Sequence, residues 1–97
     1  MAMTPEAKVK AQIKAWLKAR SIWYCCPIGS GFGSSGVPDF ICCWDGGFLA
    51  IEAKAPGKRG NTTPLQDDQI MGIHRAGGAA IVVDDIKQLD EMEASLG

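Results

Sequence analysis

A tight turn at Asp45-Gly46-Gly47 limits the folds open to this chain more than any other part of the sequence. The flanking segments, 39–44 and 48–54, are rich in apolar residues that favour β-structure. Asp-Gly is typical of a type I′ hairpin turn, in which both central residues have positive φ. If Asp45 and Gly46 are those residues, Trp44 pairs with Gly47, and counting back places Asp39 opposite Glu52. A different turn would shift this register.

Helical patterns precede and follow this hairpin. The first helix has Thr4 as N-cap and Pro5 at its first position, and it ends near Arg20. Apolar residues recur along it at the spacing of one buried face: Val9, Ile13, Trp16 and Leu17. In the second helix Thr63 is the N-cap, Pro64 follows, and Gln66 completes a capping box. Gly77-Gly78 ends that helix.

The remaining segments complete an αβββαβα order. We expect a strand at 22–26, a glycine-rich loop at 27–36 and a buried strand at 79–83. Asp84 is the expected cap of a last helix with four apolar residues on its inner side: Ile86, Leu89, Met92 and Leu96. The pattern predicts an α/β fold with a mixed four-stranded sheet flanked by helices, in a single domain over residues 1–97.

Composition excludes several classes of protein. Apolar residues make up 46% and charged residues 22% of the chain, which is typical of a globular protein rather than a disordered one. There is no apolar run of the roughly 20 residues that a membrane span needs, and no secretory signal. We therefore expect a cytoplasmic protein of a bacterial or virus-infected cell.

The four cysteines form two adjacent pairs, Cys25-Cys26 and Cys42-Cys43. Neighbours in a strand point to opposite faces, so neither pair suits one zinc ion. In a reducing compartment we expect these cysteines to serve as small apolar residues within two strands.

Charge is unevenly distributed along the chain. Residues 1–60 carry eight Lys/Arg against four Asp/Glu, a balance of +4, whereas residues 61–97 carry two against seven, a balance of −5. The first part is suited to a polyanion from which the acidic tail stays away. Solvated helix faces are an equally good explanation.

Glu52 and Lys54 are charged residues at the end of a strand that is otherwise apolar. Being two residues apart, they share a face, and in the expected register Asp39 lies opposite Glu52. Two carboxylates this close repel each other unless a cation lies between them, and their oxygens suit Mg²⁺ or Mn²⁺. Such an ion can polarise a phosphodiester and activate water, while Lys54 orients the water or stabilises the transition state. The alternative is a surface Glu–Lys pair beside a hairpin.

Glu6 is a further candidate ligand, because it lies seven residues before Ile13 and therefore on the buried face of the first helix. An inward carboxylate needs a partner. The metal is one possible partner, and a nearby lysine or partial exposure at the edge of the core is the alternative.

These residues resemble a known family. Gly36-Val37-Pro38-Asp39 followed by Glu52-Ala53-Lys54 matches the Pro-Asp…(Asp/Glu)-x-Lys signature of the restriction-endonuclease-like nucleases. The chain more narrowly resembles the VRR-NUC (virus-type replication-repair nuclease) group over roughly Glu6 to Val83. The segments that follow the Glu-x-Lys motif are also similar to that group: Thr63-Pro64-Leu65-Gln66, Ala76-Gly77-Gly78 and Ile81-Val82-Val83.

The resemblance implies a restriction-endonuclease-like αβββαβ(α) core and a role for each matching residue. Glu6, Asp39 and Glu52 would bind metal directly or through water, and the carbonyl of Ala53 would be a further ligand. Lys54 would be the catalytic lysine, and Gln66 would help to organise the site, although its capping role alone explains its presence. Gln69, one turn later, is a minor candidate.

The expected substrate is DNA. Lys58 and Arg59 are placed to contact phosphates near the scissile bond. Lys10, Lys14 and Lys18 could extend that contact without reading sequence, and a solvated helix face explains these three equally well. Resemblance to junction resolvases implies branched DNA, such as a four-way junction, in phage or cellular replication and repair. Cutting two strands symmetrically needs two sites, hence a homodimer. Three aromatic residues could serve its interface or belong to the core: Trp23, Trp44 and Phe48.

Other functions remain open on the sequence. A non-catalytic nucleic-acid-binding module would keep the fold and its basic loops without needing both Asp39 and Glu52. A metal-free interaction domain would tolerate Lys54→Ala. A helicase or other replication protein is a possible partner for so short a chain.

Overall fold

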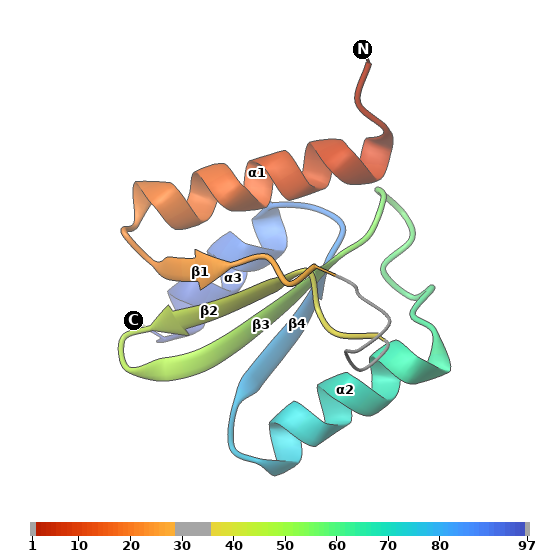
Figure 1. The fold of residues 1–97 in the computed structure, drawn as a ribbon. Helices are drawn as coiled ribbons and strands as arrows, with labels where there is room; N and C mark the ends of the chain where they lie inside the picture. The colour runs from red at the N-terminus through yellow and green to blue at the C-terminus, as the bar shows by residue number, and fades with distance from the viewer. Residues whose placement is uncertain (1, 29–35, 97) are drawn as a thin grey trace.

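The computed structural model describes residues 2–28 and 36–96. Within them the predicted αβββαβα order is confirmed (Figure 1). The elements are α1 (Pro5–Ala19), β1 (Trp23–Cys25), β2 (Phe40–Trp44), β3 (Gly47–Ala53), α2 (Pro64–Arg75), β4 (Ala79–Val83) and α3 (Lys87–Leu96). The strands form one sheet in the order β1-β2-β3-β4, with β4 parallel to β3 and the other pairs antiparallel. The mixed four-stranded α/β fold is therefore confirmed. Residues 29–35 of the expected loop lie outside the described residues.

The hairpin has the predicted turn and register. Trp44 pairs with Gly47 and Phe40 with Ile51. Asp45 (φ 51°) and Gly46 (φ 80°) both have the positive φ that a type I′ turn requires. Continuing the ladder by one residue places Asp39, which precedes β2, opposite Glu52 of β3.

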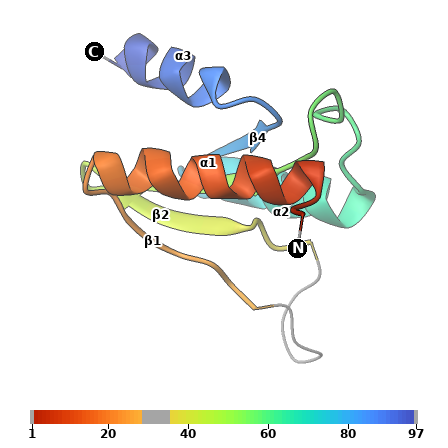
Figure 2. The same cartoon turned by 90° about the horizontal axis from the view of Figure 1, so that it is seen from above.

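The two faces of the sheet have different coverings. Alternate residues of β2 and β3 form the core with α1 and α3, and the largest fully buried side chains in this layer are Phe40, Ile13, Leu17, Ile51 and Leu89. α2 lies on the opposite side of the sheet, where it packs against β4 (Figures 1 and 2). None of the twelve residues of α2 is buried. The apolar core is therefore concentrated on one face of the sheet.

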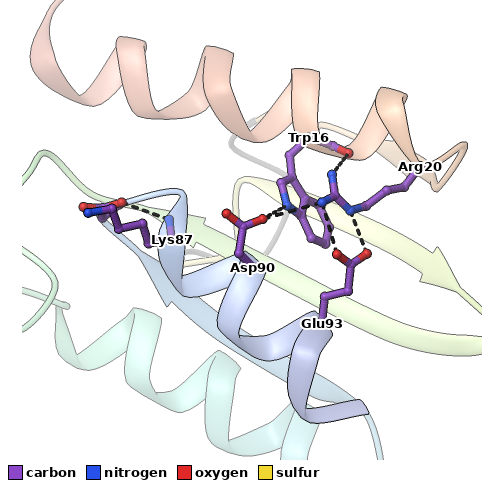
Figure 3. Close-up of polar contacts among 6 residues, drawn as sticks. Trp16, Arg20, Lys87, Asp90 and Glu93 are labelled. Carbon is purple, nitrogen blue, oxygen red and sulfur yellow. Dashed lines mark hydrogen bonds and ion pairs between the residues drawn. The ribbon is translucent and has the colours of Figure 1, made fainter. Parts of the chain in front are cut away.

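Polar contacts fix α3 against α1 (Figure 3). Trp16 Nε1 donates a hydrogen bond to Asp90 Oδ1 at 2.8 Å, and Arg20 donates two to the carboxylate of Glu93, at 2.7 and 3.1 Å. The guanidinium of Arg20 also lies 3.8 Å from the centre of the Trp16 ring, a cation–π contact. These bonds orient the acidic helix α3 over the core.

Three expectations were wrong in detail. β1 is shorter than 22–26, because the pairing with β2 begins at Trp23 and ends at Cys25. Asp84 does not cap the backbone of α3. Its side chain accepts hydrogen bonds from the loop after β3 and from the Gln88 side chain, whereas the N–H of Lys87, where α3 begins, donates to Asp85 Oδ1 at 2.9 Å. Leu96 is 68% exposed rather than inside, because it lies in the last turn of α3, beyond the buried Leu89.

The cysteines match the expectation only in part. All four are free, but Cys42 alone is buried, and Cys25, Cys26 and Cys43 are exposed. Cys25 and Cys43 lie on the face of β1 and β2 opposite to Cys42, away from the core, and Cys26 follows the end of β1. Among the described residues, none of the helices has the length and apolar character that a membrane span needs.

Candidate active site

The candidate site lies at one end of the sheet, where four elements meet (Figure 1). Asp39 immediately precedes β2, Glu52 lies near the end of β3, and Lys54 directly follows it. Gln66 is in the first turn of α2, and Lys10 is in the first half of α1. Residues from distant parts of the sequence thus converge here.

Glu52 is the most unusual group in this cluster. Among the described residues it is the one charged side chain that is buried, with 5% of its surface exposed. Its Oε1 accepts a hydrogen bond from Gln66 Nε2 at 3.2 Å, whereas its buried Oε2 has no hydrogen-bond partner within the described part of the chain. Burial, and then the neighbouring carboxylate of Asp39, raises the pKa of Glu52 to about 8. An unpartnered buried carboxylate is costly, so this position needs a proton or a cation.

Asp39 is attached to the end of β3. Its Oδ2 accepts a hydrogen bond from the backbone N–H of Ala53 at 2.8 Å, which ties the start of β2 to the residue that follows Glu52. Its Oδ1 lies 3.5 Å from Lys10 Nζ. The Asp39 carboxylate therefore has a fixed place next to Glu52.

Gln66 links Lys54 to Glu52. Its Oε1 accepts hydrogen bonds from Lys54 Nζ at 2.9 Å and from the Thr63 backbone N–H at 3.0 Å, and its Nε2 donates to Glu52. The capping box is present as predicted, because the Gln66 backbone N–H also donates to Thr63 Oγ1. The two explanations offered for Gln66 are therefore compatible: its side chain caps α2 and contacts both residues of the Glu-x-Lys motif.

Glu6 and Lys10 are arranged differently from the expectation. The Glu6 side chain is 46% exposed, and its Oε2 lies 3.6 Å from Lys10 Nζ. Both alternatives offered for Glu6 are present in the structure, the nearby lysine and partial exposure. Lys10, expected to extend the phosphate contact, lies between the carboxylates of Glu6 and Asp39. Within residues 2–28 and 36–96, no three His, Cys, Asp or Glu side chains are grouped closely enough to hold a metal ion.

The basic loop after β3 is anchored by Asp84. Asp84 Oδ2 accepts hydrogen bonds from the backbone N–H groups of Gly57 at 3.1 Å and Arg59 at 3.2 Å, and Oδ1 accepts one from Gln88 Nε2 at 2.6 Å. The hydrogen bond from Gln88, followed by those from the loop, lowers the pKa of Asp84. Sequence reasoning missed this anchoring role, because a carboxylate after a strand is equally compatible with a helix cap.

The predicted DNA-contact residues outside the cluster have different surroundings. Lys58 and Lys14 are exposed. Arg59 is exposed too, but its Nε donates a hydrogen bond to the Val82 carbonyl at 2.7 Å, so part of its guanidinium is used to hold the loop against β4. Gln69, the minor candidate, lines a cavity beside Phe48 and Ile73, one turn along α2 from Gln66.

Gly36, the first residue of the Gly36-Val37-Pro38-Asp39 motif, has a structural role in the site that the sequence did not predict. Its φ is +77°, and a Cβ there would lie 2.5 Å from the carbonyl carbon of Leu65 and 2.7 Å from the backbone nitrogen of Gln66. The chain leading into Asp39 therefore runs directly against the first turn of α2. The motif alone does not reveal this packing role, because the requirement for glycine comes from a tertiary contact.

Asp39 and Glu52 fit a divalent cation. Mg²⁺ is commonly held by one or two carboxylates, with water and substrate phosphate completing its shell. The unpartnered Glu52 Oε2 and the adjacent Asp39 carboxylate provide such a pair. Ala53 is buried beside them, with its N–H on Asp39. The arrangement can therefore place one cation next to the Lys54 ammonium.

No model of a known protein family matches the chain, and no curated protein matches its sequence.

Proposed function

We propose that this chain is a metal-dependent endonuclease that hydrolyses DNA phosphodiester bonds. The observation that carries the proposal is the buried Glu52, whose Oε2 has no hydrogen-bond partner among the described residues, beside Asp39 and joined through Gln66 to Lys54. A structural ion pair does not need two adjacent carboxylates with one buried oxygen unsatisfied. Such a pair needs a proton or a cation, and a divalent cation held between the two carboxylates meets that need.

The restriction-endonuclease-like fold and membership of the VRR-NUC group are part of the same proposal. They are supported by the αβββαβ order, by the mixed sheet and by the position of Pro38-Asp39 and Glu52-Ala53-Lys54 at one end of it. The proposed site lies where the matching motifs meet.

Each residue of the cluster has a proposed role. Asp39 and Glu52 would hold Mg²⁺ or Mn²⁺, with the Ala53 carbonyl and, through water, Glu6 as further ligands that the resemblance implies. When bound, such an ion polarises the phosphodiester and neutralises negative charge that develops on it. Lys54 has three N–H donors, of which Gln66 takes one, so the ammonium can also orient the attacking water or bind a phosphate oxygen. Gln66 positions Lys54 and Glu52.

The proposed substrate is branched DNA, such as a four-way junction. Lys58, Lys14 and the outer part of Arg59 would contact phosphates, which gives affinity without sequence preference. A homodimer would present two sites to two strands. The exposed Trp23 (62%) and Phe48 (45%) are the candidates for a subunit contact. Trp44 is a poorer one, because its ring packs edge-on against Trp16 at 5.9 Å. The proposed setting is replication or repair in the cytoplasm, with a helicase as a possible partner.

A cleavage assay tests this function. Purified protein is incubated with four-way junction, flap and linear DNA in Mg²⁺, Mn²⁺ or EDTA, beside Asp39→Asn and Lys54→Ala. We expect junction cleavage that needs the metal and is lost in both variants. Cleavage that persists in EDTA would exclude a metal-dependent reaction. Cleavage that persists in both variants would exclude Asp39 and Lys54 as catalytic residues. DNA that is bound but never cut would favour the non-catalytic binding module.

A further inference from the structure

Lys10 occupies a distinctive position within the candidate site. Its Nζ lies 3.5 Å from Asp39 Oδ1 and 3.6 Å from Glu6 Oε2, so one ammonium lies between two carboxylates. The Lys10 side chain is 39% exposed. It therefore has an open path to solvent along a flexible four-carbon stem.

The charge of Lys10 is permanent at neutral pH. A lysine side chain keeps its proton at neutral pH, and the two carboxylates beside Lys10 favour the charged form. In the metal-free protein, the Lys10 ammonium is therefore the cation that neutralises the carboxylates of Asp39 and Glu6.

We propose that Lys10 is a built-in counter-ion of the metal-free site, which competes with the divalent cation for Asp39. The inference rests on the proposed function and adds a residue that controls metal affinity. Two cations close to the same carboxylate repel each other, so Lys10 must withdraw when the divalent ion binds. Asp39 keeps its position meanwhile, because its other oxygen accepts the hydrogen bond from Ala53.

The competition has a measurable consequence in each state of the protein. Without metal, removing the ammonium leaves Asp39 and Glu6 without their counter-ion, so the fold becomes less stable. With metal, removing it eliminates a competitor, so the ion binds more tightly. A residue that merely stabilises α1 would not produce this opposite pair of effects.

Calorimetric titration of DNA-free protein with Mn²⁺ and Mg²⁺ tests the inference. The proteins compared are wild type, Lys10→Met, Lys10→Arg, Lys14→Met and Asp39→Asn. We expect Lys10→Met to bind the ion about fivefold more tightly, the effect of removing one partly exposed ion pair. Lys10→Arg retains the charge and Lys14→Met lies one turn away on an exposed position, so both should bind like wild type. Thermal unfolding in EDTA should show a lower melting temperature for Lys10→Met than for Lys14→Met.

The results separate this inference from the proposed function. If wild type binds the ion, Asp39→Asn does not, and Lys10→Met binds like wild type or more weakly, the inference is overturned while the proposed function stands. If wild type binds no divalent cation, both are overturned. Should Lys10→Met fail to fold, Lys10→Gln is compared under the same criteria.

Discussion

The side chain of Gln66 contacts three parts of the molecule: the N-terminus of α2, Lys54 and Glu52. Its two functions can be separated, because Thr63 shares the cap but does not touch the Glu-x-Lys residues. We expect Gln66→Ala and Thr63→Ala each to lower the free energy of unfolding by about 1 kcal/mol through the lost cap. Only Gln66→Ala should also slow DNA cleavage, by roughly tenfold or more, the usual effect of removing a residue that orients a site.

Urea unfolding and single-turnover cleavage of the two variants measure these effects. Equal loss of cleavage in both would show that Gln66 acts only through the helix.

Glu52 makes the stability of the metal-free protein depend on pH. Its pKa rises from 4.5 to about 8 on folding, so the folded state holds the proton more tightly than the unfolded state does. The resulting stability is fully present below pH 4.5 and is lost as pH rises through about 8. Unfolding free energy measured in EDTA should therefore fall across this range in wild type.

The Glu52→Gln variant is the control for that titration, because it keeps the shape of the side chain without its proton. Its unfolding free energy should fall less over the same pH range. Parallel curves for the two proteins would mean that another group is responsible.

Among the structural elements, the loop before β2 and the start of α2 depend on a contact that glycine alone permits. Gly36 and Gly57 have nearly the same φ, +77° and +81°, but only Gly36 faces backbone atoms within 4 Å. We expect Gly57→Ala to cost about 1 kcal/mol, the conformational penalty of positive φ. Gly36→Ala should cost clearly more and should also impair cleavage, since backbone atoms of Leu65 and Gln66 must move.

Chemical denaturation of both variants tests this difference, with Gly57→Ala as the matched control. Similar losses of stability in the two proteins would contradict the contact between Gly36 and α2.

Much of the element order was predictable because its signals are local. The Asp45-Gly46 turn fixed the β2–β3 register, and the Thr63–Gln66 capping box fixed the start of α2. The start of α3 was not predictable, because Asp84 is used instead by the loop at Gly57 and Arg59, a contact made across 25 to 27 positions.

The same distinction applies to the candidate site. The facing of Asp39 and Glu52 followed from hairpin geometry. The position of Lys10 between Asp39 and Glu6 did not, because it depends on how α1 lies over the sheet. The unsatisfied oxygen of Glu52 also needed the fold, since a strand pattern indicates which face a residue shares but not what surrounds each atom.

On the scale of the whole molecule, the candidate site and the end of the chain lie apart. The N-terminal end of α1, the C-terminal end of β3 and the start of α2 meet on one side, whereas α3 runs away from them to the C-terminus (Figures 1 and 2). The acidic residues of α3 include Asp90 and Glu93, which are paired with α1. This arrangement agrees with a polyanion approaching the site from the side opposite to the acidic tail.

The central claim is that Asp39 and Glu52 hold one cation together, and a double-mutant comparison tests it most directly. Single-turnover junction cleavage in Mg²⁺ is measured for wild type, Asp39→Asn, Glu52→Gln and the double variant. If both carboxylates serve one ion, either substitution removes its function, and the double variant should cleave about as slowly as each single one. Losses that multiply in the double variant, or cleavage unaffected by either substitution, would contradict a shared metal site.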